Sequence, residues 1–221
     1  MGITGICFIP VLLLKTMDTI LYFIDLFGTF IFALSGAVIG VKKNYDVFGV
    51  FVISLVTAIG GGVIRDICIS STPPVGLITG EYLIGVFLAI IIVSFFQKFI
   101  LSFQKPSTFF DAIGLGFFAA FGANKTYQYT GSIQLSVILG CASAVGGGVF
   151  RDILTGKSPS IFTQDLYASA AIIGSLIELM GATGVIDNRI SIWVSILTTT
   201  TIRMLAIKYK IKLPSIKNKN M

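Results

Sequence analysis

The residues best suited to chemistry belong to one short motif that occurs twice. Each copy has three consecutive glycines, two apolar residues and an Arg-Asp pair, and the copies read GGGVIRD and GGGVFRD. Their glycines and charges are Gly60, Gly61, Gly62, Arg65 and Asp66, and Gly146, Gly147, Gly148, Arg151 and Asp152. Both copies follow long apolar stretches, where a charge is unfavourable unless it pairs or faces a cavity. This pattern favours a path for a charged or polar solute, with the arginines lining or gating its two mouths.

Both parts of the motif also have a structural alternative. Three glycines favour a kink or break in a helix, at roughly 1 kcal/mol each relative to alanine, but small residues also permit close helix packing. The arginines could snorkel from helix ends to the lipid headgroups, as we expect for Arg203 in the last apolar run. Because the motif occurs at two related positions, we favour paired kinks that shape a pore.

Further acids lie within the apolar runs. Asp25 and Asp111 occupy equivalent positions one run before each motif. Acids inside a membrane are functional candidates, whereas an acid at a helix N-terminus is favoured by the helix dipole alone. Both alternatives stay open for Asp25, and the structural one is favoured for Asp111. Glu81 and Glu178 do not occupy equivalent positions and receive less weight.

The missing side chains exclude several classes of function. The chain has no histidine, and Cys7, Cys68 and Cys141 are not spaced as CxxC. This argues against a metal site, a Ser/His or Cys/His catalytic pair, and a bound cofactor. No phosphate-binding loop or nucleic-acid feature is present. The sequence therefore predicts a protein that is not an enzyme.

The composition predicts a protein dissolved in lipid. Hydrophobic residues make up 55% of the 221 residues, and the mean hydropathy is +0.94. Charged residues make up only 12%, about half the usual share for a soluble domain. Seven apolar runs have roughly the length that a bilayer requires. They cover residues 20–41, 47–65, 76–99, 108–125, 131–153, 165–183 and 189–207.

An internal repeat with an offset of 86 residues organises these runs. The offset relates the two motifs and several further pairs. These are Asp25 and Asp111, Gly28 and Gly114, Phe32 and Phe118, Ala33 and Ala119, Gly36 and Gly122, Ala37 and Ala123, and Pro73 and Pro159. Each repeat holds three runs, and an odd number inverts the second copy in the membrane. We therefore predict an all-α integral membrane protein with seven transmembrane helices, an inverted three-plus-three repeat plus a seventh helix.

The predicted segments follow from this repeat. They are an N-terminal segment 1–19, a first three-helix repeat 20–105, a second, inverted repeat 106–187, a seventh helix 188–207 and a basic tail 208–221. Seven spans place only four of the 16 basic residues, Lys15, Arg65, Lys125 and Arg189, on one side. The positive-inside rule then predicts an outside N-terminus and a cytoplasmic C-terminus. The tail lysines also favour contact with anionic membrane lipids.

The repeated GGGVxRD motif, with an aspartate one span earlier and a proline seven residues after the final Asp, resembles a known family. The sequence is similar to the prokaryotic branch of the trimeric intracellular cation (TRIC) channels, whose domain is also described as a glycine transporter domain. The resemblance covers about residues 20–207. Animal members carry a Lys-Glu pair where this chain has Arg151-Asp152, so phosphoinositide regulation is not implied.

The resemblance implies seven transmembrane helices and a homotrimer in a prokaryotic plasma membrane, with one pore inside each protomer. It also implies that the second and fifth helices kink at their glycines, and that the pore conducts monovalent cations, chiefly potassium. On the residues alone, a polar path could also include Ser54, Thr57 and Ser143.

Two further functions stay open. One is a secondary transporter of a small amino acid such as glycine, because inverted repeats with broken helices are a common transporter design and arginine suits a carboxylate. The other is a membrane scaffold, which the symmetric charges argue against. Saturable uptake coupled to an ion gradient would distinguish the transporter from the channel.

Overall fold

The computed structural model describes residues 11–103, 105–163 and 166–211, with side chains from residue 19 onward apart from residue 163. All regular secondary structure in these ranges is helical. The helices are α1 (Val11–Lys42), α2 (Val47–Cys68), α3 (Val75–Ile78), α4 (Gly80–Phe95), α5 (Gln97–Ser102), α6 (Pro106–Thr130), α7 (Ile133–Leu154), α8 (Ser160–Thr163), α9 (Ala168–Ala182) and α10 (Asn188–Tyr209). The predicted all-α membrane protein is therefore confirmed, while Cys7, most of the segment 1–19 and most of the tail lysines lie outside the described residues.

Five helices are long and apolar enough to cross a membrane, namely α1, α2, α6, α7 and α10. The third and sixth predicted runs differ from the helices observed. The run 76–99 is divided among α3, α4 and α5, and the helix of the sixth run begins only at Ala168. Thr79 and Phe96, the residues at the two divisions, have non-helical backbone angles. The apolar composition therefore predicted where both segments lie, but it did not predict that their helices are interrupted or shortened.

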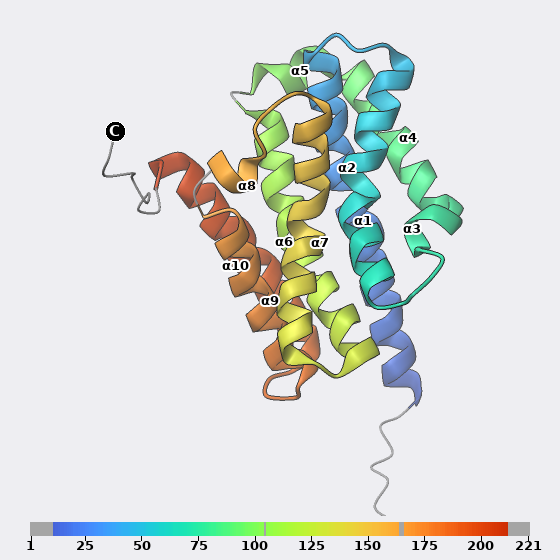
Figure 1. The fold of residues 1–221 in the computed structure, drawn as a ribbon, viewed down its shortest axis with the longest axis vertical. Helices are drawn as coiled ribbons and strands as arrows, with labels where there is room; N and C mark the ends of the chain where they lie inside the picture. Colours follow the sequence, from blue (N-terminus) through green and yellow to red (C-terminus); the bar gives the residue numbers. More distant parts are fainter. Residues whose placement is uncertain (1–10, 104, 164–165, 212–221) are drawn as a thin grey trace, which may run out of the picture.

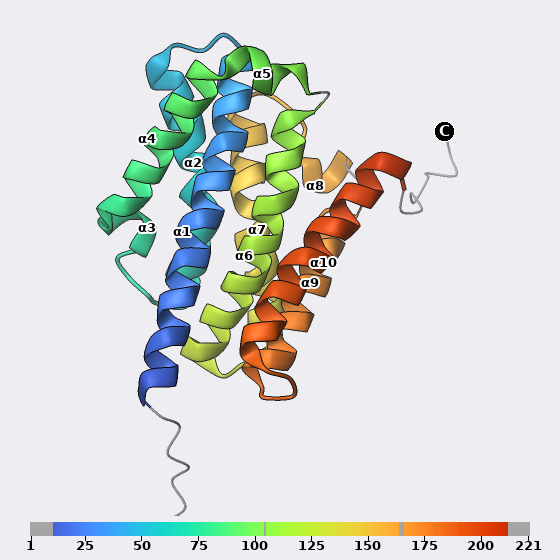
Figure 2. The same ribbon diagram turned by 180° about the vertical axis from the view of Figure 1, so that it is seen from behind.

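The helices form two groups of the same design. In one, α1 packs against α2 and α4; in the other, α6 packs against α7 and α9. Figures 1 and 2 show α1 and α6 side by side in the middle of the bundle, and α2 beside α7. The last helix, α10, has no counterpart in the first group and packs against α6 and α9.

Equivalent residues in the two groups play equivalent parts. The Asp46 carboxylate accepts a hydrogen bond from the Gly49 N–H at the start of α2, and the Ser132 hydroxyl accepts one from the Leu135 N–H at the start of α7. Such N-caps satisfy backbone donors that the helix itself leaves free. At the centre of the bundle, one of the repeated phenylalanines stacks directly on its counterpart: the Phe32 and Phe118 rings lie 5.1 Å apart at an interplanar angle of 8°.

The glycine triplets lie inside continuous helices, so neither helix is broken there, and the kinks that we favour from the sequence stay a prediction. Instead, their central glycines allow α2 and α7 to touch through the backbone. A Cβ atom on Gly61 would lie 1.9 Å from the Ser143 carbonyl oxygen, and one on Gly147 would lie 2.1 Å from the Thr57 carbonyl oxygen. Close packing by small residues, the structural alternative, accounts for this contact.

We expect Gly61→Ala and Gly147→Ala each to destabilise the protein by about 1–3 kcal/mol, the usual effect of overpacking, because neither backbone oxygen can move independently of its helix. Thermal and denaturant unfolding in detergent measure this effect. Gly85→Ala is the matched control, since nothing lies within 4 Å of a Cβ atom built on Gly85 in α4. Equal stability of all three variants would contradict close packing at the crossing of α2 and α7.

Candidate functional site

Arg151 lies at the centre of a buried polar group, here called the Arg151 cluster, with Ser35, Asp111, Asp152 and Ser160. The Arg151 Nη1 atom donates to the Asp111 carboxylate and to the Ser35 hydroxyl, both at 2.7 Å. Its Nε and Nη2 atoms both donate to the Asp152 Oδ1 atom at 3.0 Å. The other Asp152 oxygen accepts from the Ser160 N–H at 2.9 Å and from its hydroxyl at 2.8 Å. One side chain thus links α1, α6 and α7, and its neighbouring aspartate holds α8.

The corresponding Arg65 cluster contains Asp25, Asp66, Tyr82 and Lys125 besides Arg65. The Arg65 Nε and Nη2 atoms lie 2.9 and 2.8 Å from the Asp66 Oδ1 atom, and Lys125 Nζ lies 2.8 Å from the same oxygen. Asp25 does not contact Arg65 in this way and instead accepts a 2.6 Å hydrogen bond from the Tyr82 hydroxyl. Here two cations from different helices share one carboxylate.

The second member of each Arg-Asp pair also has a structural role. Asp66 Oδ2 accepts from the Val75 N–H at the start of α3, as Asp152 Oδ2 accepts from Ser160 at the start of α8. Helix N-termini leave such donors unsatisfied. The aspartates therefore fix the turn that follows each motif helix, while their other oxygens hold the arginines.

Burial excludes the snorkelling alternative for the arginines. Arg65 is 1% exposed and Arg151 4% exposed, and both side chains pair with carboxylates inside the protein. The expected snorkelling of Arg203 is also wrong, because Arg203 is 1% exposed and its guanidinium lies 4.7 Å from the centre of the Tyr167 ring. Position near a helix end did not predict solvent contact, since neighbouring helices cover these ends.

A cavity adjoins each cluster. The one beside the Arg151 cluster has a volume of about 110 Å³ and is also lined by Ser107, Lys157 and Ser158. The one beside the Arg65 cluster has about 10 Å³ and is also lined by Thr29 and Gly62, which is near the minimum for one water molecule. The two cavities lie toward the C-terminal ends of α2 and α7, which point to opposite ends of the bundle (Figure 1).

The crossing of α2 and α7 separates the two cavities. Thr57 and Ser143, whose carbonyl oxygens face the central glycines, are both fully buried. The Thr57 hydroxyl donates to the Ile53 carbonyl at 2.6 Å, whereas the Ser143 hydroxyl has no partner among the described atoms. Ser54 likewise bonds back to its own helix, at the Val50 carbonyl. Of the three hydroxyls predicted to line a path, only the Ser143 hydroxyl makes no hydrogen bond within the described residues, and it lies at the crossing.

The third glycines face the clusters rather than the crossing. A Cβ atom on Gly62 would meet Arg65 Nη2 at 3.7 Å, an ordinary contact, whereas one on Gly148 would lie 2.5 Å from the Tyr167 hydroxyl and 3.2 Å from Asp111. The first glycines face the other motif directly: a Cβ on Gly60 would meet Phe150, and one on Gly146 would meet the Gly61 Cα atom at 3.0 Å.

Sequence reasoning missed Tyr82, Tyr167 and Lys125. Tyr82 and Tyr167 differ by 85 residues, so allowing a one-residue gap after the repeated prolines would have paired them. The sequence places Lys125 at the end of the apolar run 108–125, but α6 continues to Thr130 and carries Lys125 to Asp66. Its importance depends on the packing of α6 beside α2, which the sequence pattern does not give.

Glu178 forms a third polar group, away from both cavities. It is fully buried, accepts a 2.6 Å hydrogen bond from the Asn124 amide and a 3.1 Å bond from the Ser191 hydroxyl, and so joins α9 to α6 and α10. Glu81, by contrast, is exposed at the start of α4. Over the ranges that the structure describes, no three Asp, Glu or Cys side chains gather as a metal site.

Comparison with known proteins gives consistent relatives. A family model described as "Glycine transporter" matches residues 22–98 and 108–183. A UPF0126 membrane protein of Vibrio cholerae is 33% identical over 205 residues, which are 90% of this chain and 84% of that protein.

Solved structures share the fold. One, described as the structural basis for conductance through TRIC cation channels, is 39% identical with a TM-score of 0.80 and covers 90% of this chain and 98% of its own. The TRIC orthologue of Rhodobacter sphaeroides is 27% identical with a TM-score of 0.82 and covers 87% of this chain and 100% of its own.

The repeated glycine motif, the paired charged clusters and these relatives agree, and the chain belongs to the family described as "Glycine transporter", the prokaryotic branch of the TRIC family.

Proposed function

We propose that this membrane protein is a monovalent cation channel that conducts potassium through a path inside each protomer. The observation that carries the proposal is the pair of polar cavities, one at each Arg-Asp cluster, on either side of the crossing of α2 and α7. A solved TRIC cation channel with 39% identity over nearly the whole chain supports the same function.

In this proposal, the bundle is an inverted repeat with seven membrane segments, in which α4 and α9 are the short third and sixth spans. The reciprocal contacts of Gly61 with Ser143 and of Gly147 with Thr57 support a two-fold relation between residues 20–105 and 106–187. The segment 188–207 adds the seventh span. The excess of basic residues at the α5 end of the bundle supports a cytoplasmic C-terminus and an outside N-terminus in a prokaryotic plasma membrane.

The described conformation corresponds to a closed channel. The α2–α7 crossing brings carbonyl oxygens against glycine Cα atoms and leaves no passage there, and Lys125 occupies the approach to Asp66. Opening requires α2 and α7 to separate or bend at Gly60–Gly62 and Gly146–Gly148, where the absence of side chains lowers the resistance to bending. The glycines thus act as both the packing surface and the proposed kink positions.

The carboxylates suit a cation more than the arginines suit an anion. In the Arg151 cluster, two carboxylates face one arginine, whose Nη1, Nη2 and Nε atoms all donate to this cluster. Arg151 therefore has few free N–H groups with which to bind the carboxylate of glycine, as the transporter alternative requires. Asp25, Asp66, Asp111 and Asp152 therefore supply the negative potential that offsets the arginines along the path.

The proposed assembly is a homotrimer, because the solved relatives are trimeric cation channels. Each protomer has its own pair of cavities, so conduction in this arrangement does not require a pore on the three-fold axis. Membrane lipids complete the surroundings of the exposed apolar helix faces.

Purified protein in potassium-loaded liposomes is expected to give voltage-driven, non-saturating potassium flux with unitary current steps. Liposomes without protein supply the background, and radiolabelled glycine uptake is measured in parallel. Saturable glycine accumulation without unitary currents would overturn the channel and establish the secondary transporter instead.

Lys125→Met is expected to raise potassium flux by about five-fold, the factor for roughly 1 kcal/mol of partly exposed ion pairing. The change removes the ammonium from Asp66, which keeps its bond to Arg65. Arg189→Met removes an exposed charge at the same end of the bundle and is the control. An unchanged flux for Lys125→Met, or the same increase for both variants, would show that Lys125 does not restrict entry.

A further inference from the structure

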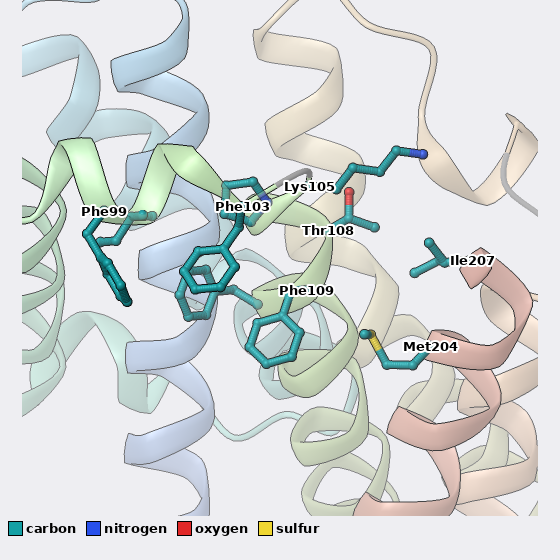
Figure 3. Close-up of a pocket in the computed structure, with 10 residues that line it drawn as sticks. Phe99, Phe103, Lys105, Thr108, Phe109, Met204 and Ile207 are labelled. Carbon is teal, nitrogen blue, oxygen red and sulfur yellow. The ribbon is translucent and has the colours of Figure 1, made fainter.

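A large apolar cavity lies outside both charged clusters, at the α5 end of the bundle. Its volume is about 500 Å³, and its walls come from α5, the first turn of α6 and the last turns of α10. Figure 3 shows the rings of Phe99, Phe103 and Phe109 along one side, with Met204 and Ile207 of α10 facing them. This volume is within the range of small-molecule pockets, roughly 300–1,000 Å³.

The cavity exists because α10 leaves the bundle toward its C-terminal end. Lower in the bundle, α10 is in close contact with α6: a Cβ on Gly116 would lie 2.7 Å from the Ile196 carbonyl oxygen, and Thr200 donates to the Ala112 carbonyl at 3.4 Å. Beyond that level the two helices diverge (Figures 1 and 2). The side chains of the first turn of α6 do not fill the gap between the two helices.

The rim of the cavity is positively charged. Lys105 lines it and, in Figure 3, extends over its upper end beside the Thr108 hydroxyl. Lys98 on α5 and Lys208 and Lys210 at the end of α10 are also exposed, and α5 and α10 are two of the helices that form the cavity walls. Across the described part of the chain, none of these four lysines forms an ion pair with a carboxylate.

We propose that this cavity binds an anionic phospholipid, with an acyl chain between α6 and α10 and the phosphodiester at Lys105 and Thr108. The apolar walls suit hydrocarbon, and the unpaired ammonium group at the rim suits a phosphate. The exposed Phe96, Phe99 and Phe103 add further apolar surface beside the cavity.

Charge favours a lipid over a second copy of the chain as the occupant. Among the described residues, Asp46 is the exposed carboxylate at this end of the bundle, whereas Asp187 is exposed at the other, in the loop before α10. A second copy in the same orientation would therefore bring mainly further lysines to the rim. An anionic headgroup supplies the missing negative charge, independently of which solute the protein conducts.

Tryptophan quenching by brominated lipid tests the proposal. Trp193, the single tryptophan, is replaced in the variant Trp193→Phe, and Phe103→Trp then places a reporter in the cavity wall while keeping an aromatic side chain. The reporter is reconstituted in mixed vesicles of phosphatidylglycerol and phosphatidylcholine, in which either one lipid or the other carries brominated chains. The wild-type chain reports the same comparison at Trp193, which is 51% exposed on α10, outside the cavity lining.

The Phe103→Trp reporter is expected to show about a five-fold preference for phosphatidylglycerol, corresponding to one lysine–phosphate attraction, whereas Trp193 shows none. Adding Lys105→Gln to the reporter abolishes the preference, and Lys105→Arg retains it. Equal preference at the two tryptophans would show general attraction to the surface and would overturn a site. Absence of quenching at Phe103→Trp by either lipid would show that another occupant, such as a second copy, fills the cavity. Unfolding curves of each variant establish that the fold is retained.

Discussion

The interior of this protein depends on the direct backbone contact between α2 and α7. Helix axes approach this closely only where side chains are absent, and Gly61 and Gly147 provide that absence at reciprocal positions against Ser143 and Thr57. The contact determines where the Arg-Asp pair at the end of each helix lies. Without it, the two clusters would not be held at opposite ends of one bundle, and α1 and α6 would lose the surfaces on which they pack.

The second constraint is that charges buried in a membrane protein need partners. Leaving one partner of a buried pair without the other is strongly unfavourable, by about 3–5 kcal/mol. The two clusters meet this need differently: Arg151 bridges two carboxylates, while Asp66 is shared by Arg65 and Lys125. This asymmetry between equivalent positions gives the two clusters different charge and adjoining cavities of different size, although the repeat that builds them is the same.

The sequence predicted the parts of the structure that repeat. The offset of 86 residues related Asp25 to Asp111 and each glycine triplet to the other, and the structure places both triplets at the shared crossing. It did not predict the partners that break the symmetry. Lys125 reaches Asp66 from another helix, and Glu178 of α9 meets Asn124 of α6 and Ser191 of α10. Such contacts depend on how helices pack in three dimensions, and a periodic pattern along one chain carries little information about them.

The local effect of the glycines was also ambiguous from sequence, because their low helix propensity and their small size favour different outcomes. Packing against a neighbouring helix compensates for the propensity, and the helices remain continuous through both triplets. The snorkelling expected of Arg203 was wrong for a related reason. Its position near a helix end suggested exposure, but the side chain is buried against Tyr167.

The shortness of α4 and α9 has a consequence for the membrane around the protein. With 16 and 15 residues, these helices span only about 24 and 22 Å, less than the roughly 30 Å of a typical hydrocarbon core. They lie in equivalent places of the two groups, so in the proposed seven-span arrangement the bilayer meets a short helix on both flanks of the bundle. Hydrophobic mismatch of this kind is relieved by local thinning of the bilayer or by helix tilt, each with an energy that depends on lipid chain length. The thickness of the surrounding membrane therefore contributes directly to the relative stability of any two conformations that differ in the tilt of α4 or α9.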